Sequence, residues 1–413
     1  MRKIEVKVLM LFITCFLGVL TSCQKDSNLY DSSNHTSALE IPKGFTWSMT
    51  KTESFTIRSL VETGVSIYLD ESCTESQLIA KIAVTKESRD FSLELPAGTE
   101  RVYVQYPVQG GKSAVLPVEC QGTRASVNII LPDNAAWDWK PDDDYGMQLD
   151  HYLYKGTVMF EDQWPEIGDY DFNDFVVYYE TDGRISRGGE GLVPEVYEKE
   201  GITVSVQFRA IGGVYPYRLG LQLDSLPSKF IDEFTAHNNG GIEVKLLNPN
   251  SEKPAVFVFE GSEKLKGLNG ANYYNTEKGF EISRNDLITV TFDLKVNCYN
   301  KINKNRALSY SCAPLGQNFF ITSNKEIHLR GYAPTAYYQN YENDAKELMS
   351  SAISYYSKEG FVWGIKLPAD TPHAIEKIDF IEAYPEFKEW VVSGGVKNTN
   401  WYEHPNSNKI IQF

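Results

Sequence analysis

The sequence is poor in the residues from which metal and nucleophilic active sites are usually built. It has six cysteines and six histidines in 413 residues. It contains no CxxC pair, so a zinc ribbon or a thioredoxin-like redox site has no support, and no HExxH motif points to catalytic zinc. The GxSxG nucleophile elbow is also absent. We therefore expect a protein that is not an enzyme.

Positive charge is also scarce. The chain has 40 Lys and Arg residues against 55 Asp and Glu residues, which gives a formal net charge of -15. A field of this sign repels phosphate backbones and anionic lipid surfaces, so we expect no nucleic-acid partner. Apolar residues make up 42% of the sequence and aromatic residues 13%, enough for packed cores built largely from strands.

Long apolar runs are missing except for one near the N-terminus. Arg2, Lys3 and Lys7 precede the apolar run 8–20. As a helix this run would rise only about 20 Å, short of the roughly 30 Å of a bilayer core. The order of a charged region, a short apolar region and small residues predicts a lipoprotein signal peptide at residues 1–22 and no transmembrane helix in the mature chain.

The end of this segment, Leu20-Thr21-Ser22-Cys23, resembles the bacterial lipobox. The resemblance implies that Cys23 receives a diacylglycerol and anchors the mature chain in lipid, with ordinary cleavage of a secreted protein as the alternative. Residues 24–27 resemble the tag that sends lipoproteins of Bacteroidetes-type bacteria to the outer face of the outer membrane, although they could equally be a plain start of a tether. We expect a surface-exposed outer-membrane lipoprotein, with the periplasmic face as the alternative.

Four cysteines remain after the signal peptide and the anchor: Cys73, Cys120, Cys298 and Cys312. They allow three pairings. We favour the bridges Cys73–Cys120 and Cys298–Cys312, because each would close within one predicted domain in an oxidising envelope. Free buried thiols are the alternative.

The pattern after the anchor predicts a tether and a small first domain. Residues 23–43 are predicted to form a flexible tether, because Ser, Asn and Asp dominate the stretch 27–40. Residues 44–133 contain short strand patterns separated by turn residues, and they predict a small immunoglobulin-like or transthyretin-like β-sandwich. These strand patterns are 54–58, 65–69, 91–95, 102–106 and 127–131.

Residues 134–413 predict a second, larger β-sandwich. The alternation of apolar and polar residues in 202–208 and the apolar stretch 256–259 favour a sheet core. Two segments, 344–356 and 386–392, have helical spacing of their apolar residues. The fold class is thus mainly β, with a few short helices.

A dense run of oxygen-bearing side chains begins the second domain. Its candidate metal ligands are Asp162, Asp169, Asp171, Asn173 and Asp174. Carboxylates crowded into one loop repel each other, and Ca²⁺ relieves that repulsion while accepting six to eight oxygens. The pattern argues against an EF-hand, because Asp174 stands where that loop needs glycine and a strand pattern follows it. A solvated turn capped by Asp and Asn is the alternative to a calcium site.

The same loop resembles the hallmark of the LruC domain family of envelope lipoproteins. The resemblance rests on Phe160-Glu161-Asp162, Trp164-Pro165 and the stretch 168–174, with further matches at 327–335 and 381–395. It covers roughly residues 140–413 and implies an LruC-type β-rich domain. Many members carry a DxDGDG calcium loop just upstream, whereas here 142–146 keeps only the acidity. The family implies no catalytic activity.

These features predict a calcium-stabilised module of the cell surface. We expect it to act in adhesion, or to bind a carbohydrate or a protein. The first alternative is an accessory subunit of a surface assembly. A polysaccharide-acting hydrolase is a weaker alternative, because a pair of catalytic carboxylates can be imagined anywhere in so acidic a chain.

Overall fold

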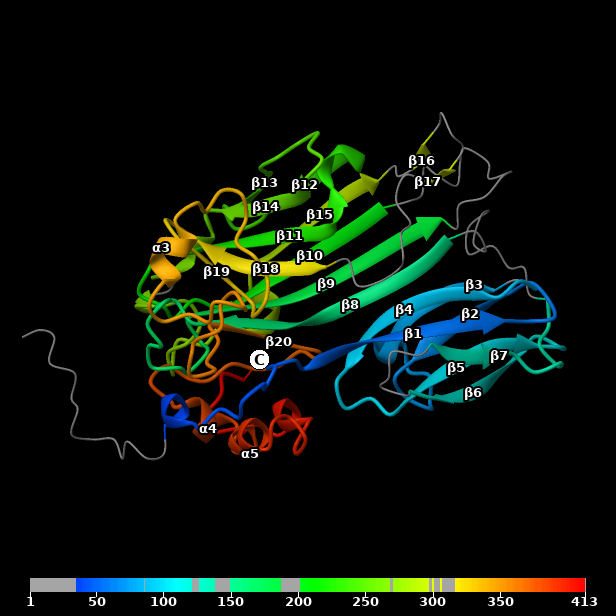
Figure 1. The fold of residues 1–413 in the computed structure, drawn as a ribbon, viewed down its shortest axis with the longest axis horizontal. Helices are drawn as coiled ribbons and strands as arrows, with labels where there is room; N and C mark the ends of the chain where they lie inside the picture. The colour runs from blue at the N-terminus through cyan, green and yellow to red at the C-terminus, as the bar shows by residue number, and fades with distance from the viewer. Residues whose placement is uncertain are drawn as a thin grey trace, which may run out of the picture.

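The protein consists of two β-sandwiches and a small helical region (Figure 1). The computed structural model describes residues 35–84, 86–120, 126–137, 149–186, 201–267, 270–296, 299–300, 305–306 and 316–412. Strands dominate these residues, which confirms the predicted mainly-β class.

The N-terminal sandwich packs a three-stranded sheet against strands of a much larger sheet. The three-stranded sheet has the order β4-β1-β7, with β1 at Thr50–Arg58, β4 at Arg89–Pro96 and β7 at Val127–Ile130. The opposing strands are β2 at Thr63–Tyr68, β3 at Leu78–Val84, β5 at Arg101–Val108 and β6 at Lys112–Glu119. Alternate residues of β4 and β5 are buried, as a half-buried strand requires. Phe55 and Phe91 stack in this core at 5.3 Å between ring centroids.

The second sandwich is built on two long strands, β8 at Leu149–Phe160 and β9 at Phe175–Ser186. Its first layer continues with β10 at Gly201–Ala210, β15 at Thr289–Val296 and β12 at Ile231–His237. Its second layer has the order β13-β14-β11-β18-β19, at Glu243–Leu246, Pro254–Glu260, Arg218–Pro227, Gln317–Thr322 and Glu326–His328. Between the layers Phe257 and Phe292 stack at 4.8 Å.

One sheet runs through both sandwiches. Its order is β12-β15-β10-β9-β8-β3-β2-β5-β6, with β20 at Gly364–Leu367 also paired to β8. Because β8 is long, one edge of it accepts two partners. β3 pairs with its first half at Tyr152, and β20 pairs with its last residues at Thr157–Phe160. The two sandwiches are therefore joined by backbone hydrogen bonds as well as by the chain.

The helical region follows β20 and forms a separate aromatic core. Its helices are α4 at Phe380–Ala383, α5 at Phe387–Val392 and the 3-10 turn η9 at Trp401–Glu403. Trp390 and Trp401 lie 5.7 Å apart in this core. The remaining short elements are η3 at Glu75–Gln77, η5 at Ser228–Phe230, η6 at Ser262–Leu265, η8 at Arg284–Asp286, β16 at Tyr299–Asn300 and β17 at Asn305–Arg306.

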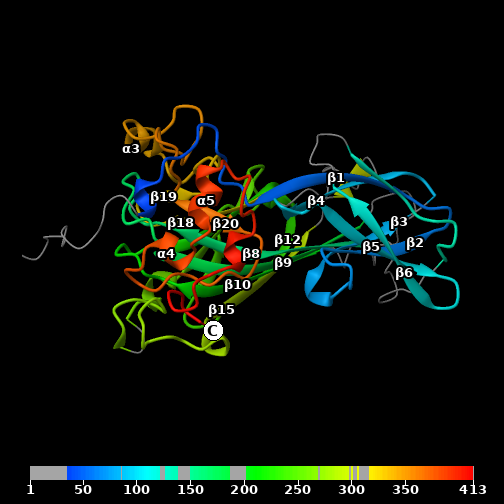
Figure 2. The same cartoon turned by 90° about the horizontal axis from the view of Figure 1, so that it is seen from below.

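The N-terminal segment packs onto this helical region, which corrects the predicted tether. Residues 36–38 form the 3-10 turn η2, and Figure 2 shows this segment beside α4 and α5. Leu39 is 7% exposed, and Trp47 lies 6.0 Å from Trp390. The prediction of a flexible tether over 23–43 is therefore wrong for 35–43, because Leu39 and the aromatic residues just beyond it supply apolar surface that the polar composition of 27–40 does not reveal. Residues 23–34 lie outside the described residues.

The helix predicted at 344–356 is mostly absent. Helix α3 covers only Tyr341–Ala345, and turns follow it. Tyr341 stacks on Trp164 at 5.6 Å, and Tyr355, with a left-handed φ of 50°, contacts the same ring at 5.4 Å. The segment folds around this buried tryptophan, and its serines are weak helix formers. The second predicted helix, at 386–392, is present as α5.

Cys73 and Cys120 are free thiols, so the predicted bridge between them is absent. Cys73 lies between β2 and β3, whereas Cys120 follows β6. In the sheet, β5 lies between β2 and β6. The predicted partners Cys298 and Cys312, like the predicted anchor Cys23, lie outside the described residues.

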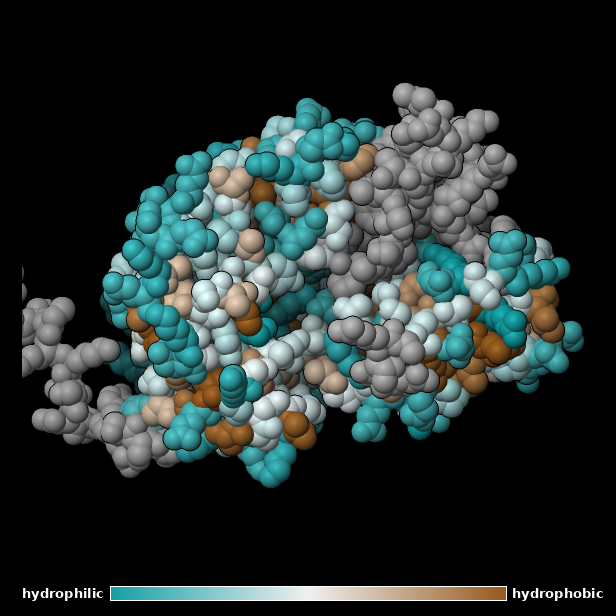
Figure 3. Space-filling model, in the orientation of Figure 1, coloured by the Kyte–Doolittle hydropathy of each residue, from teal (hydrophilic) through white to brown (hydrophobic). Residues whose placement is uncertain are grey.

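The space-filling view shows how apolar surface divides between the sandwiches (Figure 3). Hydrophilic and neutral residues cover most of the second sandwich on this face, and apolar residues gather over the N-terminal sandwich and over the helical region. Exposed apolar side chains of that sandwich and its connections include Leu60 at 67%, Val115 at 38% and Ile130 at 57%.

Candidate metal centre

The connection between β8 and β9 folds into an unusual backbone shape. Gly168, Tyr170 and Phe172 all have left-handed φ angles, of 73°, 61° and 55°. For a bulky residue this conformation costs on the order of 1 to 3 kcal/mol, so the surroundings must hold it in place. The rings of Tyr170 and Phe172 are fully buried and lie 4.6 Å apart. Aromatic packing thus supports one side of the loop.

Glu161 supports the other side of the loop. Its carboxylate accepts the backbone N–H of Tyr170 at 3.1 Å and that of Phe172 at 2.5 Å. Backbone N–H groups that converge in this way form a pocket for an anion, and here the anion belongs to the protein itself. Glu161 immediately follows β8 and is fully buried. The loop therefore closes over a buried carboxylate.

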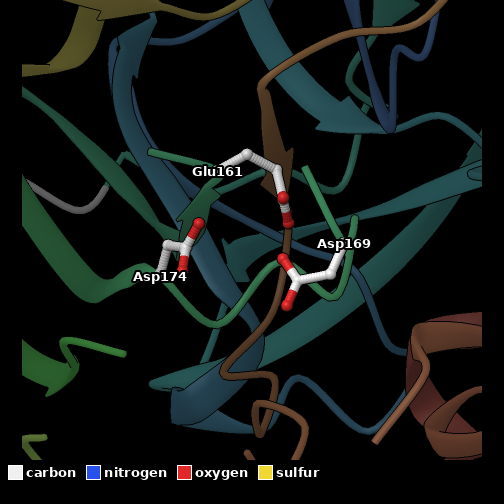
Figure 4. A group of neighbouring side chains, drawn as sticks. All are labelled: Glu161, Asp169 and Asp174. Carbon is white, nitrogen blue, oxygen red and sulfur yellow. The ribbon is translucent and has the colours of Figure 1, made fainter. Parts of the chain in front are cut away.

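Three carboxylates of the loop converge on one point (Figure 4). An oxygen of Glu161, one of Asp169 and one of Asp174 all lie within 4.8 Å of each other. Glu161 and Asp174 are buried, whereas Asp169 is exposed. The group is therefore open to solvent on the side of Asp169.

The other predicted ligands border this group. Asp162 accepts the backbone N–H of Tyr215 at 2.9 Å through Oδ2, and its own N–H donates to Asp174 at 2.8 Å. Oδ1 of Asp162 is buried without a hydrogen-bond partner. Asp171 and Asn173 bind each other, since the side-chain amide of Asn173 donates to Asp171 at 2.8 Å. The structure thus brings Asp169 and Asp174 together with Glu161 and leaves Asp171 turned toward Asn173.

Burial and mutual repulsion favour the protonated forms of these acids. Burial, followed by the charges of Asp174, Asp171 and Asp169, raises the pKa of Glu161 well above its usual range. Burial is also the largest cause of the raised pKa values of Asp171 and Asp174, and neighbouring carboxylates add to it. Burial raises the pKa of Asp162 as well. The folded chain therefore holds these carboxylates where their charge is poorly compensated.

Lys266 is a positive charge near the group. Its ammonium donates to the carbonyl oxygens of Gly213 and, at 2.9 Å, Tyr215. Burial lowers its pKa, although Asp162 and Asp174 act in the opposite direction. One partly desolvated lysine cannot compensate four buried carboxylates, and uncompensated buried charge is strongly destabilising.

Two glycines let the backbone approach these side chains. The N–H of Gly212 donates to the carbonyl oxygens of Asn173 and Asp174, at 3.2 and 3.1 Å. A Cβ at Gly212 would lie 2.6 Å from Oδ1 of Asn173, and one at Gly213 would collide with Asp162. Any larger residue at 212 or 213 would push the oxygen-bearing side chains apart. We call this pair the glycine wall.

The sequence analysis missed two acids at this centre. Glu161 lies inside the hallmark motif, but it directly follows strand β8. Its position in the sequence does not fit the regular spacing of the acids that were predicted as ligands. Glu376 comes from the distant C-terminal region, and its Oε2 is buried without a hydrogen-bond partner, 3.2 Å from a Cβ at Gly212. Burial, and then the charge of Asp169, raises the pKa of Glu376 to about 7. No sequence pattern links Glu376 to the loop.

The donor set suits a hard divalent cation. Its atoms are carboxylate oxygens, which Ca²⁺ prefers, and among the described residues no sulfur or imidazole ligand belongs to the group. Glu161, Asp169 and Asp174 would form the centre of such a site, and a cation there would compensate the charges that Lys266 leaves uncompensated.

Two family models match the chain. Residues 200–402 match a domain of unknown function (DUF4842), and residues 63–128 match another domain of unknown function (DUF4841). The first match covers much of the second sandwich and the helical region, and the second covers most of the N-terminal sandwich. Neither model carries the LruC name or a described activity.

A solved structure shares the architecture of both sandwiches. It is the crystal structure of a chain described as a lipoprotein from Bacteroides ovatus, with 28% sequence identity and a TM-score of 0.67. The match covers 84% of this chain and 99% of that one. None of the curated proteins matches the sequence.

Among the residues that the structure describes, no helix is both long and apolar enough to cross a membrane. The fold of this chain is similar to that of a bacterial chain described as a lipoprotein, and residues 63–128 and 200–402 match two domains of unknown function.

Proposed function

We propose that the protein is a non-catalytic lipoprotein on the surface of the outer membrane, anchored through Cys23, in which Ca²⁺ stabilises an LruC-type second sandwich. The stabilised sandwich presents a binding surface for adhesion to a carbohydrate or a protein. The observation that carries the calcium proposal is the convergence of Glu161, Asp169 and Asp174 within 4.8 Å, two of them buried. The similarity to a Bacteroides chain described as a lipoprotein supports the anchor.

A groove on the second sandwich supports the binding role. It has a volume of about 210 Å³ and lies on the outer face of the five-stranded layer. Arg218 and Glu260 form an ion pair of 2.6 Å in this groove, and Tyr337, 54% exposed, stands at its side. An exposed aromatic ring beside groups that donate and accept hydrogen bonds suits a sugar or a polar peptide.

The calcium proposal is tested by thermal unfolding of the full chain in detergent, with Ca²⁺ or with EGTA. A ligand that binds only the folded state stabilises it by about 4 kcal/mol at a thousand times its dissociation constant. We expect a higher melting temperature with Ca²⁺, and no increase in the double variant Asp169→Asn, Asp174→Asn. The variant Asp232→Asn, at an exposed position, should respond like the wild type. Identical wild-type melts in Ca²⁺ and EGTA would refute the proposal.

The binding role is tested on a glycan array and a panel of host-matrix proteins. We expect retention of the wild-type chain and loss of retention in Tyr337→Ala, while Phe280→Ala, which removes another exposed aromatic ring, leaves it intact. Absence of retention on both panels would argue against a binding module. Turnover of any polysaccharide or peptide in the same assays would show that the protein is an enzyme.

Surface exposure is tested on intact cells. External protease should remove the chain from the outer face, with a periplasmic protein as the control for membrane integrity. Full protection of the chain would place it on the periplasmic face instead.

A further inference from the structure

The carboxylate of Glu376 faces the same glycine wall as the metal-binding loop. Its Oε2 would lie 3.2 Å from a Cβ at Gly212, and Oδ1 of Asn173 would lie 2.6 Å from the same atom. Gly212 is in turn hydrogen-bonded to the backbone of Asn173 and Asp174. Glu376 therefore reaches the loop from a segment that lies far away in the sequence.

Two buried carboxylate oxygens at this wall have no hydrogen-bond partner. One is Oε2 of Glu376, and the other is Oδ1 of Asp162, a residue that is only 3% exposed. Asp162 is tied to the carboxylate cluster because its N–H donates to Asp174. A carboxylate oxygen removed from water without a donor or a cation is unfavourable, so both oxygens point to a positively charged ligand.

Glu376 also lies in a segment that holds the N-terminus of the described chain. We call residues 373–379 the strap. His373 donates through Nε2 to the carbonyl oxygen of Asn275 at 2.7 Å. The backbone N–H of Glu376 donates to the carbonyl oxygen of Thr276 at 2.9 Å. The strap is thus fixed to the connection between η6 and η8.

The end of the strap binds the N-terminal segment. Asp379 accepts the backbone N–H of Thr36 at 3.0 Å and also the hydroxyl of the same residue. The same carboxylate caps helix α4 by accepting the N–H of Ile381 at 3.0 Å. The residue that docks the N-terminal segment therefore stands three positions after Glu376.

We infer that Glu376 is a ligand of the divalent cation, and that the bound cation fixes the strap on which the N-terminal segment 35–38 docks. This inference rests on the calcium site of the proposed function. Under this inference, binding of the cation determines whether the segment that leads toward the predicted lipid anchor is docked. In the absence of the cation, repulsion between Glu376 and the loop carboxylates favours release of the strap.

The test uses the full chain in detergent and combines Ca²⁺ titration calorimetry with hydrogen exchange of peptides covering 35–49. We expect Glu376→Gln, which keeps the shape of the side chain, to weaken Ca²⁺ binding on the order of tenfold or more. The same variant should lose the Ca²⁺-dependent protection of 35–49. The control Glu382→Gln changes an exposed acid on α4 and should behave like the wild type. Melting in EGTA checks that both variants are folded.

Failure of the inference is distinguishable from failure of the proposed function. If the wild type binds Ca²⁺ and Glu376→Gln binds it equally well, Glu376 is not a ligand, although the calcium site stands. If Ca²⁺ leaves the exchange of 35–49 unchanged in the wild type, the coupling to the N-terminal segment is refuted. If the wild type binds no Ca²⁺, the proposed site and this inference are both refuted.

Discussion

The Glu94–Lys366 pair and the loop after β8 both remove carboxylates from water, but they differ in how the chain compensates the charge. Where the two sandwiches meet, Glu94 is paired with Lys366 at 2.9 and 3.0 Å, with side chains 14% and 13% exposed. Burial alone would raise the pKa of Glu94, but Lys366 and the hydroxyl of Thr50 lower it below its usual value. In the loop after β8 the corresponding pKa values are raised.

This difference distinguishes a structural ion pair from a cluster of acids whose charge the chain does not compensate. At Glu94 the burial of charge is balanced by side chains of the chain itself. At Glu161 and Asp174 the neighbours are mostly further acids. Because uncompensated buried charge is unfavourable, the first place is complete as folded, and the cation that we propose would complete the second.

The largest expected effect comes from breaking the complete pair. Lys366→Met leaves Glu94 buried without its cation and should lower the free energy of unfolding by about 3 to 5 kcal/mol. Urea denaturation measures this loss. The double variant Glu94→Gln, Lys366→Met should recover much of the stability, and an additive double variant would show that the two side chains are not coupled.

The next largest effect is the pH dependence of stability that His373 of the strap causes. Burial lowers the pKa of His373 to about 4. The charge of Arg209 also lowers this pKa, whereas the hydrogen bond to the carbonyl of Asn275 raises it. The unfolded chain takes up this proton near pH 6.5, so the stability from His373 is present above that value and is lost as pH falls to about 4. The difference amounts to about 3 kcal/mol.

Thermal unfolding in EGTA at pH 7.5 and pH 4.5 measures this effect. The variant His373→Gln, which keeps a donor for Asn275, should show a smaller loss on acidification than the wild type. Both proteins carry the same carboxylates, so the comparison isolates His373. Equal losses in the two proteins would contradict the prediction.

Neutralising one acid at each place should change the free energy of unfolding in opposite directions. In EGTA, Asp174→Asn relieves repulsion and should stabilise the folded state by about 1 to 3 kcal/mol, whereas Glu94→Gln should destabilise it by a similar amount. Urea denaturation of both variants gives the sign. If both substitutions destabilise the protein, the loop carboxylates are compensated by the chain, and the contrast between the two places is wrong.

The smallest effect is expected in the N-terminal sandwich. Because Cys73 is a free, partly exposed thiol, Cys73→Ser should change the free energy of unfolding by less than about 0.5 kcal/mol. A loss of about 3 kcal/mol would instead indicate a disulfide that the described structure does not contain. Chemical denaturation without reducing agent makes the measurement.

The sequence predicted those parts of the fold that depend on local patterns. The alternation in 202–208 and the helical spacing in 386–392 correspond to β10 and α5. Patterns failed where tertiary contacts overrode local preference. The segment 344–356 wraps around Trp164, and Leu39 is buried by helices from the other end of the chain.

The composition and spacing of residues determined by themselves that this chain is a mainly-β, acidic protein with a crowded set of oxygens after β8. Only the tertiary structure decided which oxygens meet. It placed Glu161 inside the loop, turned Asp171 toward Asn173 and brought Glu376 to the glycine wall. The physical reason is that a sequence pattern records neighbours along the chain, whereas compensation of buried charge depends on neighbours in space.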